Sequence, residues 1–326
     1  MVEAVRGKFI LVTGANVGIG FDCARQLGLM DSVGKVIITC RSAEKGAASK
    51  QRLEQLTKRD IFEVVTMDLS DLSTVEAALA LLRKEPAIDG AVLNAGGAGG
   101  AEPKALTADG VTNSVAVNVL GHVLLVDRLI KARVLGPGAS VIFSGSESAR
   151  GLRAGPPPAW SPKPVLKTGS IEEFKSICDG TFFPEEVTPA NLQHMSKLLG
   201  AHAKLLGTFW MGSMARLHPE MRFVTISPGG TSGTEVRRDL PRSKQRFVAC
   251  LMRLLACFSV VHSVDVGARR YINALFDTDA YRSGVFYGNR KGLTGAVVDQ
   301  VVFFPDFARE ELQDNASVAV TSFLPS

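Results

Sequence analysis

Short apolar runs alternate along the chain with longer segments in which apolar residues recur at helical spacing. The runs predict buried strands at residues 9–12, 35–41, 62–69, 90–96, 140–144, 222–226 and 283–287. The segments between them predict helices at residues 21–30, 42–58, 73–83, 191–217 and 111–135, the last ended by Gly136-Pro137-Gly138. Regular alternation of this kind predicts an α/β fold, a Rossmann-type doubly wound domain with a mostly parallel sheet and helices on both faces.

Two stretches interrupt this alternation. Residues 149–192 are rich in proline and lack strong periodicity, so we expect a functional loop there. Residues 231–265 are expected to form a substrate lid, with two helices between positions 241 and 276. The α/β pattern resumes after the loop and no internal repeat is visible, so we expect residues 1–326 to form one domain.

The composition is that of an ordinary globular protein. The 326 residues are 46% hydrophobic and 21% charged, and the net charge of +5 is spread along the chain. Basic residues are not interleaved with aromatic ones, so we expect no nucleic-acid partner. The five cysteines lack metal-ligand spacing, which predicts buried reduced thiols and no metal. The first strand begins within ten residues of Met1, so we expect no targeting segment and a cytoplasmic protein.

The most apolar segment covers residues 247–262. Arg253 interrupts it, and it is too short to span a bilayer. An amphipathic helix packed on the protein body is the favoured interpretation, and a peripheral membrane contact is the alternative.

A glycine-rich turn follows the first strand. The sequence TGANVGIG over residues 13–20 places glycines at 14, 18 and 20, immediately before the first predicted helix. Glycine lets the backbone approach a ligand closely, and a helix N-terminus presents free N–H groups. A strand, glycine turn and helix in this order predict a dinucleotide pyrophosphate site.

Five ordered motifs together resemble the short-chain dehydrogenase/reductase family. They are TGANVGIG, Asp68-Leu69, Asn94-Ala95-Gly96, Asn118 in VNVLGH, and Ser227-Pro228-Gly229. The resemblance covers roughly residues 8–290 and is greatest to the branch of retinol dehydrogenases and protochlorophyllide reductases. It implies a nicotinamide cofactor held by residues Gly14, Asn16, Val17, Gly18, Ile19, Gly20, Arg41, Asp68, Leu69, Asn94, Ala95, Gly96, Lys204, Pro228, Gly229, Thr231 and Thr234.

The end of the second strand favours NADP(H) over NAD(H). NAD enzymes usually place there an acidic residue that binds the ribose hydroxyls. Here Cys40 and Arg41 stand at that point, with Lys45 one helical turn on. A cation without a carboxylate suits a 2′-phosphate, although Arg41 is also acceptable as a solvated residue at a helix start. Asp68 has an alternative role as a helix cap, for which Ser70 and Asp71 compete.

The family's chemistry, as the resemblance implies it, uses a serine, a tyrosine, a lysine and an asparagine. Ser146 matches the serine, with Ser144 and Ser148 as nearby alternatives, and each also suits a turn cap. Asn118 matches the asparagine that orders a water chain, or is a satisfied amide inside a helix. Lys204 matches the lysine that lowers the tyrosine pKa and holds the nicotinamide ribose.

The tyrosine is absent. Four residues before Lys204 stands Gly200, and a competing register on Ser196-Lys197 places Gln193 there. The chain's three tyrosines, at 271, 281 and 287, all follow the Pro228-Gly229 turn. Loss of a positioned proton donor costs about 10²–10⁴ in rate. Of the histidines on this helix, His202 is expected to point away from Lys204 and His194 to lie near the edge of the site.

Three functions remain open from the sequence. The favoured one is an NADP(H)-dependent oxidoreductase acting on a carbonyl, alkene or imine of an apolar small molecule, with an atypical proton donor. The alternatives are a non-redox enzyme of the same fold (an isomerase, dehydratase or cyclase) and a catalytically inactive NADP-binding regulatory protein. The sequence does not decide the oligomeric state.

Overall fold

The computed structural model describes residues 7–97, 99–151, 162–231 and 261–325. The described strands form one sheet in the order β3-β2-β1-β4-β5-β6-β7-β8, in which each neighbouring pair is parallel except the antiparallel pair β7 and β8. The strands are β1 (Lys8–Val12), β2 (Val33–Cys40), β3 (Phe62–Thr66), β4 (Ile88–Leu93), β5 (Leu135–Ser144), β6 (Arg222–Ile226), β7 (Phe286–Lys291) and β8 (Thr294–Asp299).

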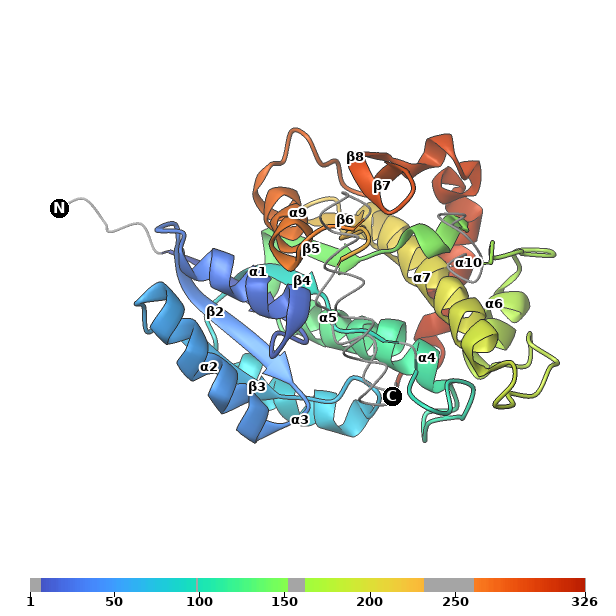
Figure 1. The fold of residues 1–326 in the computed structure, drawn as a ribbon, viewed down its shortest axis with the longest axis horizontal. Coiled ribbons are helices and arrows are strands. Elements are labelled where there is room, and N and C mark those ends of the chain that lie inside the picture. Colours follow the sequence, from blue (N-terminus) through green and yellow to red (C-terminus); the bar gives the residue numbers. More distant parts are fainter. Residues whose placement is uncertain (1–6, 98, 152–161, 232–260, 326) are drawn as a thin grey trace.

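Helices cover both faces of this sheet (Figure 1). Helices α1, α2 and α9 contribute to one apolar cluster, while α3, α5 and α7 contribute to the other, with α6 and α10 packed outside α7. Their bounds are α1 (Gly18–Gly28), α2 (Ala43–Thr57), α3 (Leu72–Leu82), α4 (Asn113–Val115), α5 (Gly121–Lys131), α6 (Ile171–Asp179), α7 (Leu192–Leu217), α9 (Val264–Phe276) and α10 (Glu310–Thr321). The expected fold, a doubly wound and mostly parallel α/β sheet, is confirmed.

The helix expected over 111–135 is shorter and interrupted. It begins at Asn113, passes through a π-helical turn at Ala116–Leu120, and ends at Lys131. Gly136-Pro137-Gly138 does not stop this helix but lies within β5, whose first residue, Leu135, pairs with β4. Asn118 lies within this π-helical turn.

The prediction of a loop over residues 149–192 is wrong in part, because the described residues of this stretch include helix α6. Ser170 caps this helix by accepting a hydrogen bond from the Glu173 backbone N–H. The spacing Ser-x-x-Glu is a helix-start pattern that could have been found in the sequence. The Glu173 carboxylate accepts from the backbone N–H groups of Lys167, Thr168 and Gly169, and these bonds hold its pKa below the usual value despite burial.

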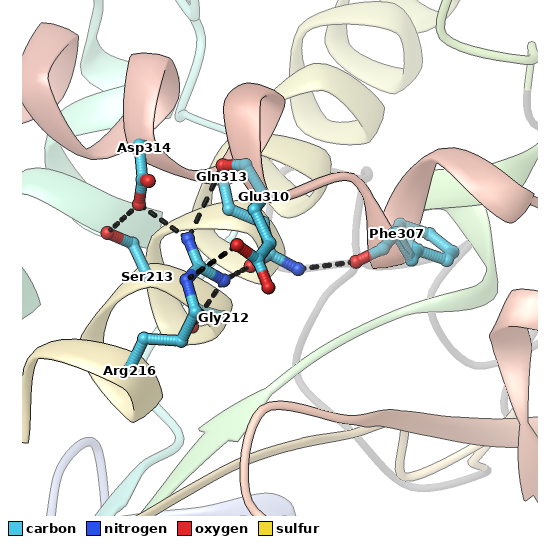
Figure 2. A network of polar contacts seen from close by, with 7 residues as sticks. All are labelled: Gly212, Ser213, Arg216, Phe307, Glu310, Gln313 and Asp314. Carbon is cyan, nitrogen blue, oxygen red and sulfur yellow. Dashed lines mark hydrogen bonds and ion pairs between the residues drawn. The ribbon is translucent and has the colours of Figure 1, made fainter. Parts of the chain in front are cut away.

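The C-terminal elements β8 and α10 were not expected from the sequence. Figure 2 shows how α10 is joined to α7 through Arg216. The guanidinium donates to Asp314 Oδ1 (2.5 Å), to the Gln313 side-chain oxygen and to the Gly212 carbonyl (3.3 Å). A Cβ at Gly212 would lie 2.4 Å from the end of the Gln313 side chain, so the two helices approach closely at this glycine. The outer face of α7 is therefore covered by the chain's own last helix.

One described helical segment, Asn113–Lys131, is long and apolar enough to cross a bilayer, with mean hydropathy 1.3. Its most apolar window is 72% buried within the protein, as in a core helix. Residues 232–260 lie outside the described residues. They include most of the lid expected over 231–265, the first of the two helices expected between 241 and 276, and most of the apolar segment 247–262.

Candidate active site

The glycine turn lies between the end of β1 and the start of α1. Gly14 and Gly18 have φ angles of +64° and +61°, which favour glycine over residues with a side chain. The Asn94 side-chain amide donates to the Thr13 carbonyl (2.9 Å), and a Cβ at Gly20 would lie 2.4 Å from that amide nitrogen. The N-cap residue Val17 supplies no side-chain acceptor to the first turn of α1. The turn is thus fixed by its own chain, and the helix N-terminus is left for an anion.

A buried hydrogen-bonded chain that sequence reasoning missed links this turn to α5. The Thr13 hydroxyl contacts His122 Nε2 at 3.0 Å and accepts from the Ala95 backbone N–H at 3.0 Å. His122 Nδ1 lies 3.4 Å from the Asn118 carbonyl. Burial, together with the charge of Lys204, lowers the pKa of His122 to about 3, so this imidazole is neutral and structural at physiological pH.

Asn118 connects the π-helical turn to the segment after β4. Its Nδ2 donates to the carbonyls of Gly97 and Ser114, both at 2.8 Å, and its Oδ1 accepts from the Gly97 backbone N–H at 3.3 Å. A Cβ at Gly96 would lie 2.7 Å from Asn118 Oδ1 and 3.4 Å from Lys204 Nζ. The expected site residues Gly96, Asn118 and Lys204 are therefore brought together, and the Asn118 side chain is fully engaged by backbone groups.

Lys204 extends from α7 toward the end of β5. Its Nζ donates to the Ser144 carbonyl at 2.8 Å and lies 5.1 Å from the centre of the Phe143 ring. This is the one hydrogen bond that the ammonium makes within the described part of the chain. Burial lowers the pKa of Lys204 to about 8. A desolvated ammonium with unused donors is ready to bind a ligand oxygen.

The three serines at the end of β5 have different surroundings. The Ser144 hydroxyl is buried and shares a 2.7 Å hydrogen bond with the Tyr271 hydroxyl, so it faces the core. Ser146 accepts from the backbone N–H and the hydroxyl of Ser148, at 3.2 and 2.9 Å. Ser146 is thus both partly exposed and the cap of a short 3₁₀ turn, Glu147–Arg150.

Gly200 lies on α7 one turn before Lys204, and a Cβ built there meets no described atom within 4 Å. None of the tyrosines compensates. Tyr271 is fully buried in the core, where burial raises its pKa, and Tyr281 packs edge-to-face against Tyr287 with ring centres 5.0 Å apart. Space for a side chain therefore exists at position 200, and no phenol occupies it.

Arg41 lies exposed immediately after β2, and it forms no ion pair within the described residues. Ser42 caps α2 by accepting from the Lys45 backbone N–H at 3.2 Å, and the Lys45 side chain is exposed. Asp68 does not cap a helix, because Asp71 caps α3. The Asp68 Oδ1 instead accepts from the Ser70 backbone N–H and hydroxyl.

The remaining expected cofactor residues follow β1, β3 and β6. Leu69 is buried, and its carbonyl would lie 2.4 Å from a Cβ at Gly121. Gly229 has φ +75° and donates its backbone N–H to the Ser227 hydroxyl at 3.1 Å. Thr231 forms an isolated bridge with His262. Asn16 in the glycine turn, Ile19 in the first turn of α1 and Pro228 after β6 are partly buried. Thr234 lies outside the described residues.

A second polar cluster, also missed from the sequence, lies beside the Pro228-Gly229 turn. Glu147 is 3% exposed and accepts from the Ser227 hydroxyl (2.6 Å) and from the backbone N–H (2.8 Å) and side-chain amide (2.7 Å) of Asn289. The buried Arg270 guanidinium donates to the Ser227 carbonyl, the Asn289 side-chain oxygen and His262 Nε2. We call Glu147, Ser227, Arg270 and Asn289 the glutamate cluster, and Gly96, Asn118, Ser144 and Lys204 the lysine cluster.

Comparison with known proteins agrees with this arrangement. The family model described as short chain dehydrogenase matches residues 8–156. The short-chain dehydrogenase/reductase phmF of Phaeosphaeria nodorum is 35% identical over 148 residues, 43% of each chain. Retinol dehydrogenase 12 of Bos taurus is 37% identical over 125 residues, 38% of each chain. The matched segment spans less than half the length of each of these relatives.

Solved structures extend the similarity of the fold beyond that segment. L-Sorbose reductase of Gluconobacter frateurii, solved with NADPH and L-sorbose, has a TM-score of 0.60 at 15% identity, covering 91% of this chain and 100% of that one. Salutaridine reductase from Papaver somniferum has a TM-score of 0.55 at 15% identity, covering 86% and 99%. Sheet order and glycine turn define a Rossmann-type nucleotide-binding fold. Residues 8–156 are therefore similar to the short-chain dehydrogenases, and the relatives of this segment include a retinol dehydrogenase.

Proposed function

We propose that the protein is an NADP(H)-dependent oxidoreductase that acts on a carbonyl, alkene or imine of an apolar small molecule without a catalytic tyrosine. The observation that carries the proposal is the lysine cluster, in which the Lys204 ammonium keeps unused donors one helical turn from Gly200. The names of the relatives, a retinol dehydrogenase among them, support redox chemistry on an apolar substrate.

The residues at the carboxyl edge of the sheet fit a nicotinamide dinucleotide. The positive φ angles of Gly14 and Gly18 shape a turn before an uncapped helix, which suits a pyrophosphate. Arg41 and Lys45 carry exposed charges without ion pairs in the described residues, and they would hold a 2′-phosphate. The bound cofactor would supply or accept the hydride. NADPH in the sorbose reductase structure supports the same choice of cofactor class.

The protein's side chains would hold and orient the cofactor. Lys204 would donate to the ribose hydroxyls of the cofactor, because its single acceptor leaves further N–H donors. Asn118 is a positioning residue in this proposal, because its amide is occupied by Gly97 and Ser114 and fixes the segment beside Lys204.

Proton supply distinguishes this site from that of an ordinary reductase. Lys204 donates a hydrogen bond to the carbonyl of Ser144. Two residues further along the chain, Ser146 has a hydroxyl that does not face the core. It would donate to the substrate oxygen, with a water molecule as the alternative. A weak donor suits substrates that need little acid assistance, such as activated ketones, conjugated alkenes or iminium ions.

The test combines NADPH oxidation by a panel of such substrates with variants at position 200. Gly200→Tyr should raise the rate on simple ketones by about 10²–10⁴, the usual effect of one positioned acid. Gly200→Phe is the matched control, since it supplies the ring without the hydroxyl and should leave that rate low. Gly200→Ala controls for helix propensity.

Two results would replace the proposal by its alternatives. Product formed without any change in NADPH absorbance would indicate a non-redox enzyme, such as an isomerase. Tight NADPH binding with no turnover on any substrate, together with inactivity of Gly200→Tyr, would indicate a regulatory nucleotide-binding protein.

A further inference from the structure

A cavity of about 270 Å³ lies against α7, away from the side that carries Lys204. His202 lines this cavity and stands two positions before Lys204, so the two side chains leave the helix about 160° apart. Neither Gly200 nor Lys204 lines the cavity. The cavity is therefore separate from both the lysine cluster and the glutamate cluster.

The wall of the cavity is mostly apolar. Its apolar side chains come from α7 and from the segments before and after α6, namely Val165, Phe182, Phe183, Pro184, Met195 and Leu198. The His202 ring packs on the rings of Phe182 and Phe183, with centres 5.4 and 5.0 Å apart. Burial lowers the pKa of His202, so this ring adds no charge to the wall at pH 7. An occupant gains most by burying an apolar body here.

Hydrogen bonds hold the two loop segments that contribute to the cavity. Before α6, the backbone N–H of Lys167 donates to the Glu173 carboxylate. After α6, the Lys104 ammonium donates to the backbone carbonyls of Phe183 and Glu185. Because both segments are fixed by the protein itself, a ligand pays little to order them.

Two ammonium groups lie at the edge of the cavity beside aromatic rings. Lys167 Nζ lies 5.3 Å from the centre of the Phe182 ring, and Lys163 Nζ lies 5.3 Å from the centre of the Phe304 ring. Both lysines are exposed, and neither forms an ion pair within the described residues. Glu185 is the one acidic residue of the lining, so the edge carries a net positive charge, which favours an anion.

We propose that this cavity binds a medium-chain fatty acid, a molecule with an apolar chain and one carboxylate. The chain packs on Phe182, Phe183 and Leu198, while the carboxylate stays in water beside the Lys167 ammonium. At about 30 Å³ for each water-sized group, the cavity holds about nine such groups, which suits the chain of octanoate. The site lies apart from the lysine cluster, so it does not depend on the proposed redox function.

The experiment compares octanoate with 1-octanol and octylammonium, which have the same chain with a neutral or a positive head. Calorimetric titration of the full chain should show octanoate binding about fivefold more tightly than 1-octanol, as expected for a solvated ion pair. Octylammonium should bind more weakly than either. Added salt should bring the affinity for octanoate toward that for 1-octanol, because the pair is screened.

Variants assign the site. Lys167→Met keeps an apolar stem and removes the charge, so it should abolish most of the preference for octanoate and leave 1-octanol binding unchanged. Lys84→Met removes an exposed cation just beyond α3 and is the matched control, with no effect expected on either ligand. Leu198→Trp fills the cavity from α7 and should weaken both ligands.

Three outcomes would overturn the proposal. They are no measurable octanoate binding, equal affinities for the three probes, and octanoate binding that is unchanged in both Lys167→Met and Leu198→Trp. Lys167 is exposed, so its variant keeps the test decisive even if Leu198→Trp fails to fold.

Discussion

The lysine cluster and the glutamate cluster both lie at the ends of strands in the same half of the sheet, yet they differ in how completely their charges are paired. The Glu147 carboxylate accepts three hydrogen bonds, and the Arg270 guanidinium makes four contacts with polar atoms. Lys204 has one hydrogen bond within the described residues. The glutamate cluster has its charges satisfied inside the protein, and the lysine cluster has unused hydrogen-bond donors.

This difference indicates that the glutamate cluster supports the fold and that the lysine cluster is available to contact a ligand. A buried charge without partners costs several kcal/mol, so a protein keeps one only where another group supplies the pairing. The glutamate cluster joins the turn after β6 to β7 and α9, which supports the Pro228-Gly229 backbone beside the expected cofactor. The lysine cluster instead presents Lys204 to the space beside Gly200.

The strongest test of the comparison removes Glu147. Glu147→Ala leaves the Ser227 hydroxyl and two N–H groups of Asn289 without their acceptor. It also removes a negative charge that acts on the buried Arg270, so we expect a loss of about 3–5 kcal/mol in unfolding free energy. Urea denaturation measures this value. Glu186→Ala, an exposed glutamate whose carboxylate makes no contact in the described residues, is the matched control and should change stability by less than about 0.5 kcal/mol. An equal, small effect of both variants would contradict the scaffold role.

The opposite pattern is expected at Lys204. Lys204→Met should weaken NADPH binding by about 10–100-fold, because one charge-assisted hydrogen bond is lost. It should leave the unfolding free energy unchanged or raised, since the ammonium is desolvated in the wild type. Calorimetric titration and urea denaturation of the same sample separate the two effects. A large loss of stability with unchanged affinity would place Lys204 among the scaffold residues.

The sequence predicted the lysine cluster better than the glutamate cluster for a physical reason. Gly96, Asn118 and Lys204 belong to motifs with fixed spacing along successive strands and helices, and parallel strands bring their carboxyl ends to one edge. Glu147 and Asn289 meet through the pairing of β5, β6 and β7, and nothing local marks either residue. Contacts of this kind depend on the register of distant strands.

The fold likewise has elements that local sequence patterns predicted and elements that they did not. Continuous apolar runs predicted the buried strands β1 to β6, because both faces of those strands are covered. Strand β8 and helix α10 were missed, since β8 is a partly exposed edge strand and α10 packs mainly against α6 and α7. The Thr13–His122 contact was missed because either residue alone has an ordinary packing role.

The pH dependence of stability gives a finer measure of the difference. The pKa of Lys204 is about 8 in the folded protein, below its ordinary value near 10.4. Between these values the unfolded chain binds the proton and the folded chain does not, so this group makes stability rise with pH from about 8 to 10. The buried thiols of Cys23 and Cys178, whose pKa values are raised, act in the opposite direction.

The difference between wild type and Lys204→Met isolates the lysine, because the cysteines are common to both proteins. We expect the unfolding free energy of the wild type, measured relative to that of the variant, to increase as the pH rises from about 8 to 10. Parallel pH profiles would mean that the ammonium is not desolvated in the folded protein.

The smallest expected effect lies at the exposed end of the cofactor site. Arg41 has no ion pair within the described residues, so Arg41→Ala should leave stability unchanged and weaken NADPH binding by about tenfold, with NADH binding unaffected. Lys58→Ala, which removes an exposed cation just beyond the other end of α2, controls for net charge and should alter neither affinity. The effect should shrink as salt is added, because a solvated pair is screened. Equal loss for both cofactors would show that Arg41 acts on the shared part of the dinucleotide and not on the 2′-phosphate.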